Sequence, residues 1–404
     1  MKLPTVRLIR AARALWRIPT LSGLLLLAAP GVNAQAPGAA APVHERISPP
    51  DRPAEIGCFG TSPESPDGRM IAYVVYDKQP SATSDGFSPG GLYRCDVDPG
   101  NRVKLRDIAR VRWHDGAMQL WIDNDTLAYT DFLPDKGYVT YVIRRNGDLV
   151  RGPIEAAIGH GDTPDGAVLL IVDGKQFPHG SNLGSNGLYL YKDGAVTQVV
   201  KLEKDLGPLK DRLKGSDNPA EWVIYHALLS TQGTHISIRL DTGPGFEHIV
   251  TCRADGTDVR LFGTATKPLH QQWYDDSTLF AHDRSGKPVE GGPRLQAKRW
   301  DRDGKVLEIL AGAGNHLGIS PDRRYLASEN MYELDPVVLK LYRTRKTEPL
   351  AVIMNVPAGP IWKMRTHVNP AFSRDGRKVY FNKPIDGMPQ VHRVNITDLM
   401  RAHD

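Results

Sequence analysis

A short phrase recurs along this chain: an apolar strand, a turn of the Ser-Pro-Asp-Gly kind, and a second strand of alternating β-forming residues. The clearest copies of the turn are residues 65–68 and 373–376. Pro presets φ and Asp-Gly takes the positive-φ positions of a tight hairpin, so each copy predicts two antiparallel strands. Weaker copies of the turn occur at residues 121–124, 163–166, 230–233, 274–277 and 320–323.

A third strand follows each pair and ends in a second polar turn, as at residues 146–148 and 254–256. Three or four short strands in each of seven units, without a long helical period, predict an all-β chain that folds as a seven-bladed β-propeller over residues 55–404. Each blade buries its faces only against its neighbours. We expect the innermost strands at residues 58–62, 110–114, 157–162, 223–229, 268–273, 315–319 and 367–372.

One segment has a helical pattern. Leu202, Leu206, Leu209 and Leu213 alternate with charged residues within residues 201–219. This spacing predicts a helix that is inserted between two blades.

The N-terminus has the pattern of a secretory signal. Five basic residues precede an apolar run at residues 21–29, and the small residues Val32 and Ala34 match a signal-peptidase site. The run is far shorter than the roughly 20 residues that span a bilayer, which favours a cleaved signal over a permanent membrane anchor. We expect residues 1–34 to be removed, residues 35–54 to form an Ala/Pro-rich leader, and the protein to be periplasmic or secreted.

Net charge excludes one class of partner. The formal charge is +5, and the five basic residues of the signal are accompanied by no acidic residue, so 5 − 5 leaves 0 for the mature chain. No basic footprint for nucleic acid remains. We expect a monomer without a nucleic-acid partner.

Three cysteines, Cys58, Cys95 and Cys252, allow at most one disulfide. Two interpretations stand: three buried free thiols, or a bridge between Cys58 and Cys95. Burial is favoured, because cysteine is among the most buried residue types.

Histidines recur at one blade position. His226, His270 and His316 each precede the turn residue of their blade by six positions, Asn369 does the same in the last blade with His367 two residues earlier, and His160 precedes its turn by five. Equivalent positions on innermost strands converge on the central channel of a propeller. Since 13 of 404 residues are histidine, chance would place fewer than one at seven such positions. The pattern therefore predicts a catalytic or metal cluster, against the alternative of a polar channel filled with ordered water.

The repeated phrases are similar to those of TolB-type periplasmic propellers and of the propeller in prolyl-oligopeptidase-type peptidases. Around the histidines, blades four to seven resemble the oligogalacturonate lyases and, more distantly, the propeller-type ulvan lyases. The likeness is carried by residues 225–230, 243–246, 252–257, 269–273, 315–322 and 366–373.

The resemblance implies a divalent metal ion (Mn, Zn or Ca) near the channel, with His270 and His367 at ligand positions and His316 beside them. Asn369 stands where the oligogalacturonate lyases carry another His, and Met364 where they carry a Gln. Asn still coordinates through its oxygen, but a thioether is a poor ligand for a hard ion. These departures argue against galacturonate and leave ulvan or another uronate polymer as the acidic glycan substrate.

β-Elimination from a uronic acid needs a neutralised C6 carboxylate, a base for the C5 proton and an acid for the departing O4. We expect His226 to be the base with Tyr225 as its partner, and Arg365 to pair with a substrate carboxylate. A second hypothesis, of another class, is a non-catalytic TolB-like propeller that binds a protein or glycan, because propellers host many unrelated functions.

Overall fold

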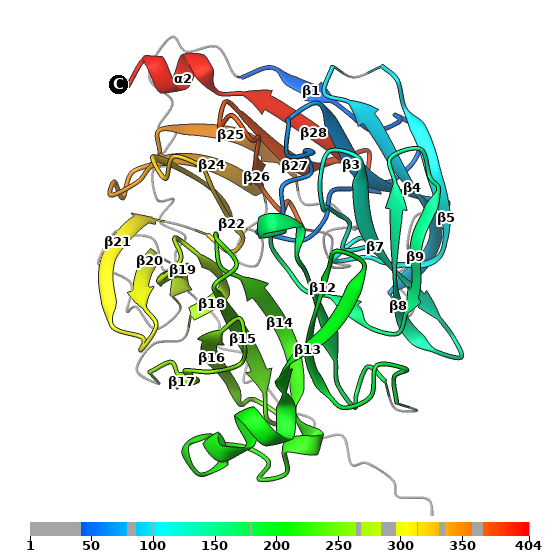
Figure 1. Ribbon diagram of the computed structural model, residues 1–404. Coiled ribbons are helices and arrows are strands. Elements are labelled where there is room, and N and C mark those ends of the chain that lie inside the picture. Colours follow the sequence, from blue (N-terminus) through cyan, green and yellow to red (C-terminus); the bar gives the residue numbers. More distant parts are fainter. Residues whose placement is uncertain are drawn as a thin grey trace, which may run out of the picture. The chain divides into compact units, whose positions relative to one another are not determined.

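The computed structural model describes residues 42–78, 86–98, 100–177, 180–263, 268–283, 296–312, 314–330, 336–357 and 367–403. They all belong to one unit, residues 35–404. The described residues form seven antiparallel sheets of four strands, arranged around a centre as propeller blades (Figure 1). The predicted all-β, seven-bladed β-propeller is confirmed. The signal segment, residues 1–34, lies outside the described residues.

Each of the first six blades uses four strands in chain order, from the innermost to the outermost. Blade one contains β2 (Ala54–Glu55), β3 (Met70–Tyr76), β4 (Phe87–Asp96) and β5 (Val103–Arg112), and blade two contains β6 (Leu120–Trp121), β7 (Thr126–Leu133), β8 (Gly137–Arg144) and β9 (Leu149–Ile154). Blade three contains β10 (Ala157–Ile158), β11 (Val168–Val172), β12 (Gly187–Lys192) and β13 (Ala195–Lys201), and blade four contains β14 (Val223–Leu229), β15 (His235–Asp241), β16 (Glu247–Arg253) and β17 (Arg260–Leu261). Blade five contains β18 (Pro268–Trp273), β19 (Thr278–Asp283), β20 (Gln296–Asp301) and β21 (Val306–Gly312), and blade six contains β22 (Leu317–Ile319), β23 (Tyr325–Glu329), β24 (Val337–Arg343) and β25 (Ala351–Val356).

The seventh blade joins the two ends of the described chain. It contains β26 (Ala371–Phe372), β27 (Lys378–Ile385) and β28 (Met388–Asn395), and its outermost strand is β1 (His44–Arg46), which pairs with β28 (Figure 1). The segment expected to be a leader, residues 35–54, therefore contributes a strand to the propeller, which begins before Glu55. A three-residue strand carries too little pattern to be recognised in an Ala/Pro-rich stretch.

The Ser-Pro-Asp-Gly turns are held by one repeated set of hydrogen bonds. Ser65 Oγ donates to Asp67 Oδ1 at 2.6 Å and accepts from Met70 N at 3.0 Å, and Gly68 adopts φ +69°. Ser320 and Ser373 make the corresponding bonds in blades six and seven. These side chains accept hydrogen bonds from backbone N–H groups of the turn. This explains why the phrase recurs between the innermost strand and the second strand.

The apolar core lies between blades. The described residues form seven buried clusters, and each draws its side chains from two adjacent blades. The cluster between blades three and four, for example, contains Leu188 and Trp222. This packing leaves the inner ends of the innermost strands free to carry polar side chains.

Two of the seven predicted innermost strands are wrong. Residues 110–114 were expected to be innermost, but the alternating run continues as the ten-residue outermost strand β5, and the innermost strand of blade two is β6. Residues 58–62 follow β2 and form no strand of their own. Innermost strands β14 and β18 have the predicted bounds, and β10, β22 and β26 lie within theirs.

Residues 57–63, here called the plug, form hydrogen bonds with blade three and with the neighbouring blade seven. Thr61 Oγ1 donates to Gly161 O at 3.3 Å and accepts from Gly161 N at 3.2 Å, in blade three. Ser62 Oγ donates to Phe372 O in blade seven at 3.3 Å. The buried polar groups of the plug thus find partners outside their own blade, which explains why the segment does not pair as a strand.

The leucine-rich segment lies between β13 and β14, as predicted, but it is not one α-helix. It forms three short helical turns, η2 (Leu202–Leu206), η3 (Gly207–Arg212) and η4 (Pro219–Glu221). Gly207 and Pro208 interrupt the helical hydrogen bonding, because proline lacks a donor N–H. The chain ends in the short helix α2 (Thr397–Arg401).

The three cysteines are free and buried, which confirms the favoured interpretation over the Cys58–Cys95 bridge. Among the described residues, no helix has the length and apolar character needed to cross a membrane.

Candidate functional site

Six histidines from successive inner strands and connections gather in the channel. Following the chain of neighbours, the imidazole centres lie 3.9 Å apart for His114 and His367, 4.2 Å for His367 and His316, 4.3 Å for His316 and His270, 6.0 Å for His270 and His226, and 4.3 Å for His226 and His160. We call these six residues the histidine cluster. It contains all five histidines that the blade alignment brought into register, together with His114, which the alignment missed.

Phe59 of the plug lies in the middle of the histidine cluster. Its ring centre is 4.9 Å from that of His270, 5.0 Å from His226, 5.1 Å from His160 and 5.8 Å from His316. The side chain is 1% exposed. The imidazoles are therefore spaced around the apolar ring of Phe59 and do not surround a continuous water-filled channel.

Phe59→Ala should destabilise the protein by about 3–5 kcal/mol, the usual cost of a large cavity in a packed core. The loss should appear in chemical denaturation with an unchanged slope. Phe246→Ala offers a matched control, because Phe246 is 40% exposed at the edge of blade four. Equal losses for the two variants would contradict the role of Phe59 as a packed centre.

Irregular backbone aims several of these side chains. The pairing of β14 with β15 shifts register between Ile224 and His226, and that of β18 with β19 shifts between Leu269 and Gln272. His270 and Asn369 adopt φ of +54° and +46°, a left-handed conformation that is costly for residues other than glycine. Such strain is concentrated at functional sites in proteins.

A cavity of about 500 Å³ opens at one end of the cluster, and Asp115, His160, Tyr225 and His226 line it. Its other lining side chains include Phe87, Phe132, Tyr138, Arg110, Arg112, Lys136 and Lys175. The guanidinium of Arg110 lies between two rings, 4.8 Å from Phe87 and 5.0 Å from Phe132. A second cavity of about 460 Å³ lies further along the same inner strands and is lined by turn residues, among them Thr163 and Ser230.

Tyr225 and His226 face this cavity together. Tyr225 is 45% exposed, its ring centre is 4.6 Å from that of His226, and the guanidinium of Arg239 lies 5.4 Å from the Tyr225 ring. Partial burial raises the pKa of Tyr225, so the phenol keeps its proton at neutral pH. His226 is 4% exposed. Its burial, and to a smaller extent the nearby His160, lower the pKa of His226 well below the usual value. The pair presents a neutral imidazole beside a protonated phenol.

Four more channel imidazoles, those of His160, His270, His316 and His367, are neutral for the same reason. Burial lowers the pKa of His160 to about 4 and that of His316 to about 3, and it lowers the pKa of His270 and His367 well below 6.5. A neutral imidazole has a lone pair available to a proton or a metal ion.

Glu329, at the end of β23, connects two histidines. Its carboxylate accepts a short hydrogen bond from His316 Nδ1, and the same Oε1 lies 3.8 Å from His367 Nδ1. Its Oε2 accepts from Val368 N at 3.0 Å. All three side chains are buried, and their ligand atoms lie within 4.8 Å of one another. A carboxylate that fixes the tautomer of a histidine is a common partner of metal-bound imidazoles.

Several polar atoms of the histidine cluster and of the nearby Asn369 have no hydrogen-bond partner within the described part of the chain. They are His160 Nδ1 and Nε2, His226 Nδ1, His270 Nδ1, His316 Nε2, and Asn369 Oδ1 and Nδ2. Buried polar atoms are normally paired, so this concentration points to a ligand or an ion. Imidazole nitrogens with amide and carboxylate oxygens form a donor set that suits Mn²⁺ and Zn²⁺. The residues present therefore fit a divalent metal.

The predicted site residues divide into three groups. Tyr225 and His226 meet at the cavity; His270, His316 and His367 gather in the channel, with Asn369 buried two residues beyond His367. Arg365 and Met364 lie outside the described residues. Sequence analysis missed Phe59, His114, Asp115 and Glu329, because none of them occupies the aligned position on an innermost strand.

Residues 86–90 match the Gly-x-Ser-x-Gly pattern of serine-hydrolase elbows. An elbow requires a sharp strand-to-helix turn that exposes the serine. Here Ser88 lies within β4 and is buried, and its Oγ donates to Lys78 O at 3.3 Å and Pro89 O at 3.1 Å. The geometry is not that of a serine nucleophile.

Comparisons with protein-family models and with curated proteins gave no match. Solved structures do match. An oligogalacturonate lyase in complex with manganese is 15% identical, with a TM-score of 0.57 over 88% of this chain and 94% of that one. An oligogalacturonate lyase from Vibrio parahaemolyticus is 13% identical, with a TM-score of 0.58 over the same shares.

A prolyl endopeptidase structure also matches, at 14% identity and a TM-score of 0.50, over 86% of this chain and 48% of that one. At such identities these matches establish a shared propeller fold. Enzymes of different classes thus carry this fold, and function must be argued from the site.

Proposed function

We propose that the protein is an exported polysaccharide lyase that cleaves a uronic-acid-containing polysaccharide or oligosaccharide by β-elimination. One observation carries the proposal: buried, neutral imidazoles gather in the channel with ring nitrogens that have no hydrogen-bond partner among the described residues, and two of them, His160 and His226, line a cavity together with basic and aromatic side chains. The fold that the chain shares with two oligogalacturonate lyases supports it.

The cavity suits an acidic sugar. It offers four basic side chains, Arg110, Arg112, Lys136 and Lys175, against three acidic ones, Asp115, Asp131 and Asp135, so the lining keeps a small net positive charge that attracts carboxylates. Aromatic rings such as Phe132 and Tyr138 supply apolar faces against which a pyranose ring packs. A uronate glycan offers carboxylates to the basic side chains and pyranose rings to the aromatic faces, whereas a neutral glycan has no group that would pair with the basic side chains. Arg365 stays a further candidate for a substrate carboxylate.

His226 is the proposed base and Tyr225 the proposed acid. The neutral His226 takes the C5 proton of the uronate, the C5–H electron pair forms the C4=C5 double bond, and the C4–O4 bond breaks. O4 leaves with a proton from the Tyr225 hydroxyl, which is protonated at neutral pH. The imidazolium then returns its proton to the phenolate, directly or through water, and both groups are restored.

A metal completes the proposal. His270, His316 and His367 with Asn369 would hold a divalent ion, and such an ion would neutralise the C6 carboxylate and so acidify the C5 proton. Glu329 orients His316 by accepting its Nδ1 proton, which leaves Nε2 as the free donor.

Glu329→Gln should weaken Mn²⁺ binding by about 10–100-fold, the usual effect of losing a carboxylate that orients a ligand histidine. Isothermal titration calorimetry on chelator-treated protein measures this directly. The control is Glu308→Gln, because Glu308 pairs with Arg299 and Arg345 in blade five, outside the histidine cluster. An unchanged Mn²⁺ affinity in Glu329→Gln would contradict a metal site at His316 and its neighbours.

The function itself is tested by ultraviolet absorbance of the unsaturated uronate product. Pectin oligomers, ulvan and glycosaminoglycans are incubated with the protein, with and without a chelator. We expect absorbance to rise with at least one uronate and to stop rising when chelator is added. Silence on every uronate would favour the non-catalytic binding hypothesis.

A further inference from the structure

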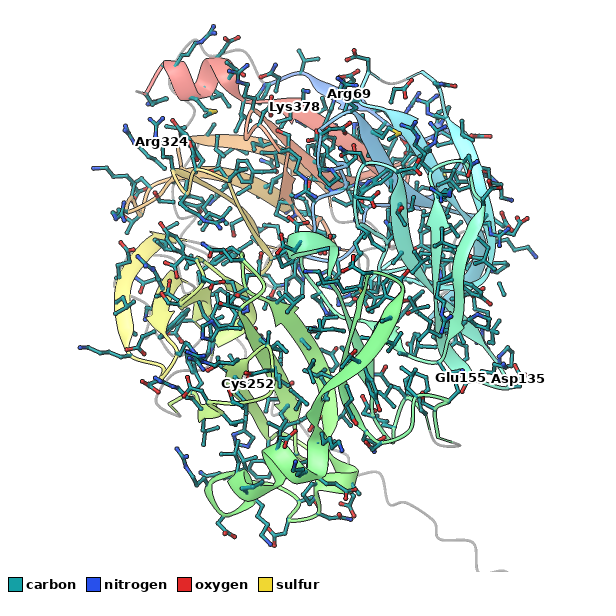
Figure 2. The ribbon with its side chains drawn as sticks, viewed as in Figure 1. Arg69, Asp135, Glu155, Cys252, Arg324 and Lys378 are labelled. Atoms are coloured by element: carbon teal, nitrogen blue, oxygen red, sulfur yellow. The ribbon has the colours of Figure 1, made fainter. Side chains whose placement is uncertain are left out.

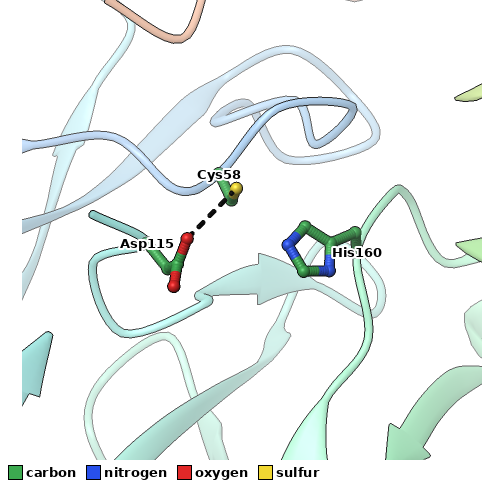
Figure 3. A group of neighbouring side chains, drawn as sticks. All are labelled: Cys58, Asp115 and His160. Carbon is green, nitrogen blue, oxygen red and sulfur yellow. Dashed lines mark hydrogen bonds between the residues drawn. The ribbon is translucent and has the colours of Figure 1, made fainter. Parts of the chain in front are cut away.

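A second cluster of metal-ligating side chains lies at the floor of the 500 Å³ cavity, apart from Glu329 and its histidines. It consists of Cys58 from the plug, Asp115 from the connection after β5, and His160 just beyond β10 (Figure 3). We propose that these three residues form a separate binding site for a borderline-soft divalent metal of the zinc and cobalt class.

The distances are close to those of a coordination sphere. The sulfur, the carboxylate oxygen and an imidazole nitrogen all lie within 4.8 Å of one another. Ligand atoms around a tetrahedral ion at 2.0–2.3 Å lie about 3.3–3.8 Å apart, so side-chain shifts of about 1 Å complete the site. Figure 3 shows the imidazole of His160 facing the Asp115 carboxylate and the Cys58 sulfur across a small gap.

Each side chain is prepared for a metal in a different way. His160 is 8% exposed, and within the described chain neither of its ring nitrogens has a hydrogen-bond partner. Cys58 is 3% exposed, and its thiol donates to Asp115 Oδ1 at 3.5 Å. Asp115 Oδ2 lies 3.3 Å from Arg112 Nη1, and Oδ1 faces the sulfur and also lies 3.7 Å from His114 Nε2. The thiol proton is the one that a metal displaces: the S–H bond breaks, a sulfur–metal bond forms, and the proton leaves to solvent.

Donor type separates this site from the first. A thiolate selects Zn²⁺ and related ions over Mn²⁺, whereas the imidazole, amide and carboxylate donors of the first site accept both. Three protein ligands leave a fourth position, and Asp115 and His160 line the cavity, so that position is open to water or to a ligand in the cavity. The chain thus carries two metal sites with different donor sets.

Cobalt titration of the chelator-treated, full-length protein tests the site without any lyase substrate. A thiolate bound to Co²⁺ gives a near-ultraviolet charge-transfer band, and we expect this band to saturate within about two equivalents, because the first site also takes up Co²⁺, and to disappear when Zn²⁺ is added. Cys58→Ser should abolish the band. Cys252→Ser should keep it, because Cys252 lies in the core of blade four (Figure 2), and His316→Gln should keep it as well.

Thermal melting shows which variants remain folded. If Cys58→Ser fails to fold, His160→Gln decides, since loss of a ligand should weaken Co²⁺ binding by at least about tenfold. The proposal is overturned if the folded wild-type protein shows no such band, if the band persists in Cys58→Ser, or if His160→Gln binds Co²⁺ as tightly as the wild type. None of these outcomes depends on whether the protein is a lyase.

Discussion

His226→Gln should lower the elimination rate by about 10²–10⁴-fold, the usual contribution of a general base. Gln fills a similar volume in the bulged strand β14 and offers no basic nitrogen, so the packing against Phe59 survives while the proton acceptor is lost. The turnover number should therefore fall much more than the Michaelis constant changes. Initial rates of ultraviolet absorbance at saturating uronate measure this effect.

His248→Gln is the matched control for that experiment. His248 lies on β16 of the same blade, and its Nε2 contacts Lys214 O at 3.1 Å, away from the cavity. We expect this control to retain full activity. If His226→Gln unfolds, or if it keeps wild-type turnover, His226 is a structural residue and the lyase proposal loses its base.

Acid should destabilise the protein steeply. His160, His226, His270, His316 and His367 all have pKa values below 6.5 in the folded state, because burial disfavours the charged imidazolium. The unfolded chain binds these protons first, so stability is fully present above about pH 6.5 and is lost as the pH falls below it. Each histidine contributes up to about 1.4 kcal/mol per pH unit, and five contribute up to about 7 kcal/mol per unit. Since domains are stable by about 5–15 kcal/mol, unfolding is expected near pH 5.

Denaturation curves in the presence of chelator between pH 7.5 and pH 5, in steps of about half a unit, measure this slope. His160→Gln should reduce the slope by about one proton. A free energy of unfolding that stays flat across this range would show that the channel imidazoles titrate normally.

The repeat made most of the fold predictable. The turn phrase fixes where an innermost strand ends, and period-two alternation gives the strand that follows, so β14 and β18 could be placed to the residue. The same alignment places His226, His270 and His316 at equivalent positions of three successive blades, and their rings are neighbours in the structure. What repeats in sequence repeats in space, because each blade packs on the next in the same way.

The rest depends on contacts that do not repeat. Glu329 reaches the channel from a second strand, through the pairing of β22 with β23. Phe59 and Cys58 reach it through the plug, whose hydrogen bonds run to blades three and seven. β1 pairs with a strand more than 340 residues later in the chain. Such partners follow from tertiary packing and leave no periodic signal in the sequence.

The mass of the products from one defined uronate oligosaccharide tests the central claim most directly. β-Elimination rearranges bonds without adding water, so the two fragments should have masses that sum to that of the substrate, and one should carry the unsaturated uronate. Fragments whose masses sum to the substrate plus one water would identify a hydrolase, and that result would contradict the lyase proposal.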